Sequence, residues 1–140
     1  MGDLTPRIQR ILETALYCAD LAQTADFYEK LLGTTRMLSG DRLVAFDAGH
    51  GTVLLLFQHG NSGALETLGG LVPGHDGSGP VHVAFAIDSG HLAAWETRLA
   101  RLGIEIESRV RWEAGGTSLY FRDPDGRSVE LATPGIWPTY

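Results

Sequence analysis

SLYFRDPDGRSVELAT, residues 118–133, carries the clearest secondary-structure pattern in this chain of 140 residues. Apolar and polar side chains alternate on both sides of the DPDG tetrapeptide, which predicts two short strands that each have one apolar face. Between them Pro124 presets φ and Gly126 permits a positive φ, as a tight turn requires. The pattern predicts a β-hairpin with Tyr120 and Glu130 on its polar face. Because an unpaired carboxylate is costly to bury, Glu130 either faces water or binds a partner.

The same succession of elements is predicted twice. The first unit is a strand, a helix and three strands, at residues 11–18, 20–33, 34–38, 42–47 and 52–57. The second unit repeats this order at residues 80–87, 92–102, 104–108, 117–122 and 127–132. Asp20 and Gly33 supply the N-cap and the C′ residue of the first helix, and Gly103 ends the second. The chain therefore contains an internal repeat.

Four positions of this repeat matter for function. At a constant offset of 75, residues 46–51 align with residues 121–126, and Leu55 aligns with Glu130. Glu13 aligns with His82 in the first strand of each unit.

We expect an α+β fold from this pattern. Two βαβββ modules, about residues 11–57 and 80–134, form a curved mixed sheet around a cleft, with the helices on its outer face. Residues 1–140 make one domain, since the chain is too short for two ordinary ones. Residues 58–79 are rich in glycine and form a linker or an active-site lid, with one helical turn near residues 64–68.

Composition excludes several classes of function. The net charge of −6 argues against nucleic acid or an anionic membrane as the main partner. Cys18 is the only cysteine, which excludes an intrachain disulfide and fits a reducing compartment. No stretch approaches the ~18 apolar residues of a membrane span, and no cationic leader precedes an apolar run. We expect a cytoplasmic protein.

The faces predicted to line the cleft carry polar side chains, three of which can bind a metal. Glu13 and Tyr17 come from the first strand, and His82, Ser118, Tyr120, Arg122 and Glu130 come from the second module. Two carboxylates and one imidazole, from Glu13, His82 and Glu130, would balance the charge of a divalent ion. This oxygen-rich set suits Mn²⁺, Mg²⁺ or Fe²⁺ at least as well as Zn²⁺, and Ni²⁺ is also compatible.

Each of these residues also has an ordinary explanation. A strand histidine such as His82 is often structural, Glu130 can face solvent, and an acidic residue near a strand start needs no special role. Asp123 and Asp125 read as turn residues. The four other histidines fall in loops or at a helix start and are expected to be solvated.

Three segments, ADLAQTADFYEKLLG, GPVHVAFAID and SLYFRDPDGRSVELAT, resemble the vicinal oxygen chelate superfamily. That superfamily includes glyoxalase I, bleomycin-resistance proteins, extradiol dioxygenases and fosfomycin-resistance thiol transferases. The resemblance covers residues 11–134. It implies paired βαβββ modules, usually in a homodimer whose two chains often complete each site. It also implies metal ligands on the first strand of each module and the last strand of the second, which are Glu13, His82 and Glu130 here.

The chain departs from each named activity of that superfamily. Glu13 stands where histidine is common, which weakens the dioxygenase interpretation. Leu55 stands where glyoxalase I has a further carboxylate ligand. Tyr120 matches a substrate-contacting tyrosine of the fosfomycin transferases, but Ala15 replaces an important threonine and residues 112–117 do not resemble their potassium-binding loop.

We therefore expect a metal-dependent lyase, isomerase or transferase for a small oxygenated metabolite or electrophile. Its catalytic residues would be Tyr120 and Glu130, and its substrate-binding residues Tyr17, Leu55 and Arg122. The alternative is a metal-free protein of the bleomycin-resistance type that binds an aromatic or cationic ligand. A fosfomycin-type thiol transferase or an extradiol dioxygenase is the third alternative, and a catalytically silent member stays open.

Overall fold

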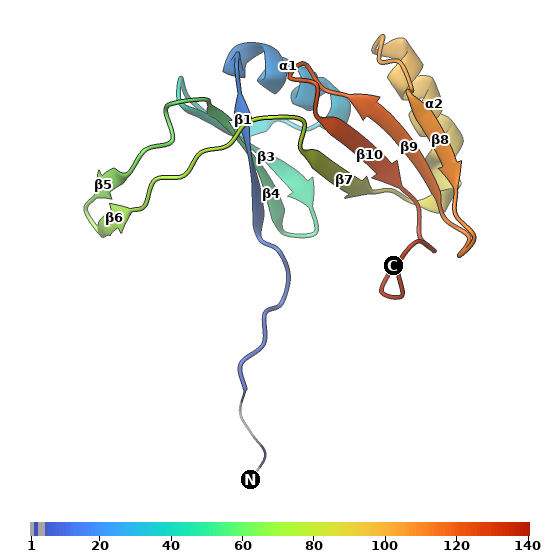
Figure 1. Cartoon of the computed structure of the whole chain (residues 1–140), viewed down its shortest axis with the longest axis horizontal. Coiled ribbons are helices and arrows are strands. Elements are labelled where there is room, and N and C mark those ends of the chain that lie inside the picture. Colours follow the sequence, from blue (N-terminus) through green and yellow to red (C-terminus); the bar gives the residue numbers. More distant parts are fainter. Residues whose placement is uncertain (1, 3–4) are drawn as a thin grey trace.

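The computed structural model describes residue 2 and residues 5–140, and it contains two βαβββ units joined by a hairpin (Figure 1). The first unit comprises β1 (Glu13–Cys18), α1 (Leu21–Leu32), β2 (Arg36–Ser39), β3 (Leu43–Gly49) and β4 (Thr52–Gln58). The hairpin comprises β5 (Leu65–Thr67) and β6 (Gly70–Val72). The second unit comprises β7 (His82–Ala86), the 3₁₀ helix η1 (Ser89–His91), α2 (Leu92–Arg101), β8 (Ser108–Arg111), β9 (Thr117–Arg122) and β10 (Ser128–Ala132). The predicted α+β repeat is confirmed.

Each unit forms its own four-stranded mixed sheet. The strand orders are β1-β4-β3-β2 and β7-β10-β9-β8. In each sheet the strand that comes first in the sequence pairs in parallel with the one that comes last, β1 with β4 and β7 with β10. The registers match as well, since Ala15 pairs with Leu55 in one sheet and Ala84 pairs with Glu130 in the other. The sheet geometry thus makes Leu55 and Glu130 structural equivalents, as the sequence offset predicts.

The apolar faces of both sheets and the two helices share one hydrophobic core. Fully buried residues from both units meet there, among them Leu16, Tyr28, Leu31, Phe46, Leu56, Leu99, Leu119, Phe121 and Leu131. Their burial supplies most of the favourable free energy of folding. Because side chains alternate along a strand, the opposite faces carry the polar residues of the predicted cleft. No helix in the described part of the chain is long and apolar enough to cross a membrane.

The first helix begins and ends where the sequence predicts. Asp20 is the N-cap of α1, and its Oδ1 accepts a hydrogen bond from the backbone N–H of Gln23 at 3.1 Å. Gly33 follows the helix with φ of 67°, a left-handed conformation that favours glycine. Its N–H donates to the carbonyl of Glu29.

Two local predictions are wrong. Residues 64–68 form no helical turn, because Leu68 and Gly69 make a tight turn that lets β5 pair with β6. The Thr67 hydroxyl closes this turn by accepting from the Gly69 N–H and donating to the Gly70 carbonyl. The strand predicted at residues 104–108 starts only at Ser108, since the N–H of Ile104 bonds back to the end of α2 at Leu99.

A buried polar network fastens the DPDG turn of the second unit to the first unit. Asp123 pairs with Arg127 at 2.7 Å, and their side chains are 0% and 3% exposed. Asp123 also accepts from the Tyr28 hydroxyl at 2.7 Å, and Arg127 donates to the backbone carbonyl of Tyr17 at 2.6 Å. Asp125 binds α1 through the hydroxyl of Thr24. Asp123 and Asp125 are therefore more than turn residues, since they join the two modules.

Burial and the Asp123 carboxylate raise the pKa of Tyr28 far above its ordinary value. Its hydroxyl therefore stays protonated and can keep donating to Asp123.

We predict that Asp123→Ala lowers the free energy of unfolding by about 3–5 kcal/mol, because it removes the buried acceptor of Arg127 Nε and of the Tyr28 hydroxyl and leaves Arg127 only its second partner, Asp125. Asp47→Ala is the matched control, since Asp47 is exposed near the end of β3, where its carboxylate accepts the N–H of Gly49. It should cost about 1 kcal/mol or less. Denaturant unfolding measures both values, and equal losses would contradict a structural role for the network.

Candidate functional site

Three strands of the second sheet bring the main candidate residues together. His82 is on β7, Tyr120 on β9 and Glu130 on β10. Tyr120 pairs directly with Glu130 across β9 and β10, and His82 pairs with Ser128 across β7 and β10. These residues share the face that is turned away from the hydrophobic core.

His82 and Glu130 face each other at short range. The imidazole Nε2 lies 3.2 Å from Oε1 of the carboxylate, and the side chains are 50% and 11% exposed respectively. The other ring nitrogen, Nδ1, lies 2.9 Å from the backbone carbonyl of Ser128. A carbonyl only accepts, so Nδ1 carries a proton in this contact. In the neutral ring, Nε2 is therefore the nitrogen with the free lone pair.

This arrangement fits a bound cation. With neutral His82, the Nε2 lone pair and the lone pairs of Oε1 point into one small space and repel each other. A proton shared as an imidazolium–carboxylate pair or a metal ion bound by both atoms relieves that repulsion. The nearly buried carboxylate of Glu130 makes either cation favourable there.

The second oxygen of Glu130 is already occupied. The Ser118 hydroxyl donates to Oε2, and the Trp112 indole Nε1–H donates to the Ser118 oxygen at 2.8 Å. The sequence places Ser118 on the cleft face, but it does not identify Trp112 as a site residue. A tryptophan in the loop before a strand has no periodicity that reveals its partner.

Tyr120 lies over the pair. Its ring stacks on the His82 imidazole with centroids 6.3 Å apart and an angle of 28° between the planes. Burial and the negative charge of Glu130 raise the pKa of Tyr120, against a smaller lowering by Ser118. The phenol is therefore a proton donor at neutral pH and not a base.

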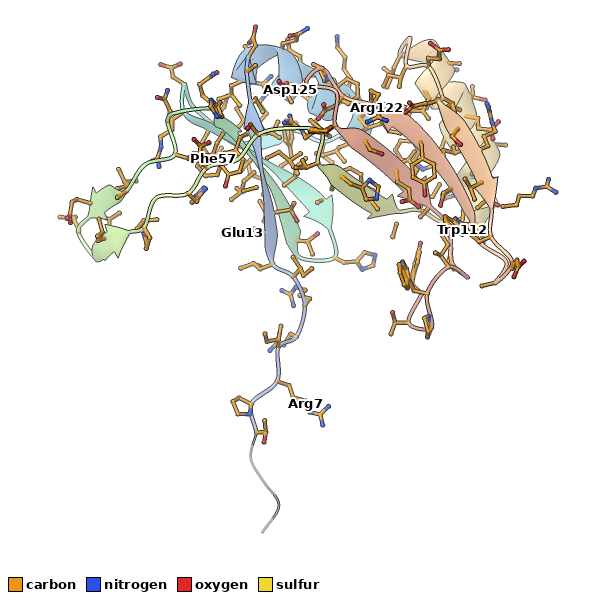
Figure 2. All side chains as sticks on the ribbon, viewed as in Figure 1. Arg7, Glu13, Phe57, Trp112, Arg122 and Asp125 are labelled. Atoms are coloured by element: carbon orange, nitrogen blue, oxygen red, sulfur yellow. The ribbon has the colours of Figure 1, made fainter. Side chains whose placement is uncertain are left out.

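Glu13 does not join this pair within one chain. In residues 2 and 5–140, no three His, Cys, Asp or Glu side chains converge in a way that could hold a metal ion. Glu13 is exposed at the start of β1, where the strand continues from the N-terminal arm (Figure 2). Its role as a third ligand stays a prediction.

Tyr17 lies on β1 of the first sheet, where residues 75–79 cover it. Its hydroxyl is 2.6 Å from Nδ1 of His75, and its ring stacks on Phe57 at 6.0 Å. Gly77 lies so close to the Tyr17 ring that a Cβ there would be 3.0 Å from it. This segment thus covers part of the first sheet, while His75 stays exposed as expected.

A cavity of about 240 Å³ lies between that segment, β1 and β7. Its lining includes Ala15, Tyr17, Ser78, His82 and Arg127. Tyr17 and His82, from different modules, therefore border one space.

The remaining candidates, Leu55 and Arg122, do not line this cavity. Leu55 is half-buried on β4 and gives the first sheet an apolar surface. The Arg122 guanidinium forms a salt bridge with Glu107 at 2.8 Å and donates to the carbonyl of Gly126. Figure 2 shows Arg122 near the DPDG turn, at the other end of its sheet from Trp112.

The fold and the site define a protein of paired βαβββ modules with a histidine–carboxylate pair on the sheet face. Residues 10–131 match the model of the Glyoxalase/Bleomycin resistance protein/Dioxygenase superfamily, and the chain belongs to that superfamily.

Individual relatives differ in activity. The chain is 29% identical over 120 residues to the metallothiol transferase FosB of Bacillus licheniformis, covering 85% of this chain and 71% of that protein. Among solved structures, a lactoylglutathione lyase from Agrobacterium tumefaciens has 34% identity and a TM-score of 0.84, with 95% and 99% of the two chains covered. A glyoxalase/bleomycin resistance protein/dioxygenase from Nocardioides has 26% identity and a TM-score of 0.70, with coverages of 96% and 91%.

We predict that Glu130→Gln lowers the pKa of Tyr120 in metal-free protein, because removing a nearby negative charge favours the phenolate. NMR titration of ¹³C-labelled tyrosine rings measures this value. Glu105→Gln, at an exposed position outside the site, should leave it unchanged. A Tyr120 pKa that stays the same or rises in Glu130→Gln would contradict the electrostatic coupling.

Proposed function

We propose that this protein is a divalent-metal-dependent enzyme that acts on a small oxygenated substrate, and that its reaction is group transfer to an electrophile. The observation that carries the proposal is the convergence of His82 Nε2 and Glu130 Oε1 at 3.2 Å. When bound, a divalent ion there would supply Lewis acidity, which polarises a substrate oxygen. The superfamily and its FosB-like members support a divalent metal without identifying it.

In this proposal Glu13 completes the ligand set from a second copy of the chain. Ile11 and Leu12 directly precede it and are 76% and 56% exposed, an apolar surface that association would cover. The arm that bears them extends away from the body of the protein (Figure 1). Proteins of this superfamily commonly dimerise. A homodimer would therefore bring Glu13 to the His82–Glu130 pair of its partner.

The residues around the pair favour transfer over isomerisation. Moving a proton between carbon atoms needs a base on the side of the cleft opposite Glu130, and the position in the first sheet that is equivalent to Glu130 holds Leu55. Tyr120, with its raised pKa, would instead donate a hydrogen bond to the substrate oxygen. Leu55 and Tyr17 would contact the carbon part of the substrate. The likeness to a metallothiol transferase is consistent with a thiol as the incoming nucleophile.

The salt bridge with Glu107 changes our proposal for Arg122. A guanidinium that is already paired with a carboxylate is less available to a substrate, so we propose a structural role at the end of β9.

A metal-free binding protein is the second candidate. The half-buried Tyr17 ring stacks on the buried Phe57, and Tyr17 and the exposed His75 together offer an aromatic surface for a planar ligand. Asp76 lies 3.6 Å from His59 beside this cluster, and the net charge of −6 favours a cationic ligand. Metal content discriminates the two candidates.

We predict about one divalent ion per chain in protein purified without a chelator or a histidine tag, measured by elemental analysis. His82→Ala and Glu130→Ala should each lose the ion, because each removes one ligand. His91→Ala and Glu105→Ala are matched controls at exposed positions and should retain it. The protein should also catalyse the reaction of a small thiol with an epoxide, which a free-thiol assay follows. This activity should require His82 and Glu130 as well.

The opposite outcome is as informative. If wild-type protein holds no metal after dialysis against Mn²⁺, Fe²⁺, Ni²⁺ and Zn²⁺, the enzyme proposal fails. Binding of a planar aromatic cation by that metal-free protein, lost in Tyr17→Ala, would then establish the binding protein.

A further inference from the structure

Glu130 is held by a chain of hydrogen bonds that starts outside the cleft. The indole Nε1–H of Trp112 donates to the Ser118 oxygen at 2.8 Å, and the Ser118 hydroxyl donates to Oε2 of Glu130. Ser118 is 0% exposed, whereas Trp112 is 38% exposed. A buried serine thus connects a residue at the surface to the carboxylate of the proposed site.

These bonds can run in only one direction. An indole N–H can only donate, and an ionised carboxylate can only accept. The Ser118 hydroxyl has a single proton, so it accepts from Trp112 and must donate to Glu130. No rotation of that hydroxyl satisfies all three groups in another way, and the carboxylate orientation is therefore specified.

The surrounding backbone leaves Trp112 little freedom. The loop between β8 and β9 is closed by hydrogen bonds from the Trp112 N–H to the Gly116 carbonyl and from the Gly115 N–H to the Trp112 carbonyl. A Cβ on Gly116 would lie 2.6 Å from a side-chain atom of Ile136 and 3.0 Å from the Thr133 carbonyl. The loop is thus packed against the segment that follows β10, and this packing holds the indole at the Ser118 hydroxyl.

The result is a carboxylate with one oxygen for the protein and one for a ligand. Oε2 is bonded to Ser118, while Oε1 faces His82 Nε2 at 3.2 Å. A carboxylate free of such a bond could rotate or bind an ion through both oxygens.

We infer that Trp112 and Ser118 are positioning residues that present Glu130 to a divalent ion through Oε1 alone, and that the Trp112 indole senses occupancy of the site. This inference rests on the proposed function, because it assigns Glu130 as a metal ligand. It extends that function to two residues that do not touch the ion.

Titration with Mn²⁺, followed by isothermal calorimetry, tests the positioning role. Ser118→Ala should weaken Mn²⁺ binding about 10- to 100-fold, the usual effect of removing the partner of a ligating group. Trp112→Phe keeps the ring and removes only the donor, so it should weaken binding less but in the same direction. Ser128→Ala is the matched control, since Ser128 lies on the same sheet face and no hydrogen bond of its hydroxyl is seen in the described residues. It should bind Mn²⁺ like the wild type.

Indole ¹H–¹⁵N spectra test the sensing role with a readout other than activity. The chain has three tryptophans, whose signals are assigned with Trp112→Phe and Trp137→Phe. Zn²⁺ should shift the Trp112 indole signal of the wild type and leave that of Trp137, which is 70% exposed, in place. In Ser118→Ala, the Trp112 signal should no longer respond to Zn²⁺.

The outcomes separate the two proposals. Wild-type Mn²⁺ affinity in Ser118→Ala, with a Trp112 signal that ignores Zn²⁺ in the wild type, would overturn this inference and leave the metal site standing. Wild-type protein that binds neither Mn²⁺ nor Zn²⁺ would overturn the proposed function and this inference together.

Discussion

The buried ion pair between Asp123 and Arg127 is the interaction on which the rest of the structure depends. The two side chains are 0% and 3% exposed, and each makes further bonds to the first module. Asp123 accepts from Tyr28 on α1, and Arg127 donates to the carbonyl of Tyr17 on β1. Arg127 directly precedes β10, so this network sets where the strand that carries Glu130 begins relative to β1.

Such a network specifies an arrangement more than it adds stability. Removing two charges from water costs about as much as their attraction returns, but an arrangement that separates them leaves both unpaired. The modules are therefore restricted to one relative placement, in which Tyr17 and His82 border the same cavity of about 240 Å³. The location of the site follows from the turn and not from the cleft residues themselves.

The two modules share a topology but have diverged in chemistry. The turn of the second module has Asp123 and Asp125, which fasten it, where the sequence offset puts Ala48 and His50 in the first. Glu130 of β10 likewise corresponds to Leu55 of β4. One module thus supplies polar groups and the other supplies an apolar surface. That asymmetry suits a site that polarises one end of a small substrate and contacts the carbon atoms at its other end.

The sequence predicts what depends on local pattern. Asp20 and Gly33 bound α1 because caps act within one helical turn, and alternation around the DPDG turn gives β9 and β10 with Tyr120 and Glu130 on one face. The hairpin of β5 and β6 could not be predicted in this way, since strands of three residues are too short to show a period. The bonds from Trp112 to Ser118 and from Asp123 to Tyr28 join residues whose contact depends on tertiary packing, which no spacing reveals. Glu13 is the opposite case, because its equivalence to His82 is visible in the sequence, whereas the described part of a single chain does not bring it together with His82 and Glu130.

The central claim is that one chain provides His82 and Glu130 while a second copy provides Glu13. Metal stoichiometry of a purified mixed dimer, in which one subunit carries Glu13→Ala and the other Glu130→Ala, tests it most directly. Our account predicts that each variant homodimer binds no ion tightly, while the mixed dimer binds one, because one of its two shared sites keeps all three ligands. A mixed dimer without metal would show that each site belongs to a single chain, and a Glu13→Ala homodimer with full metal content would show that Glu13 is not a ligand. Either result would contradict the claim.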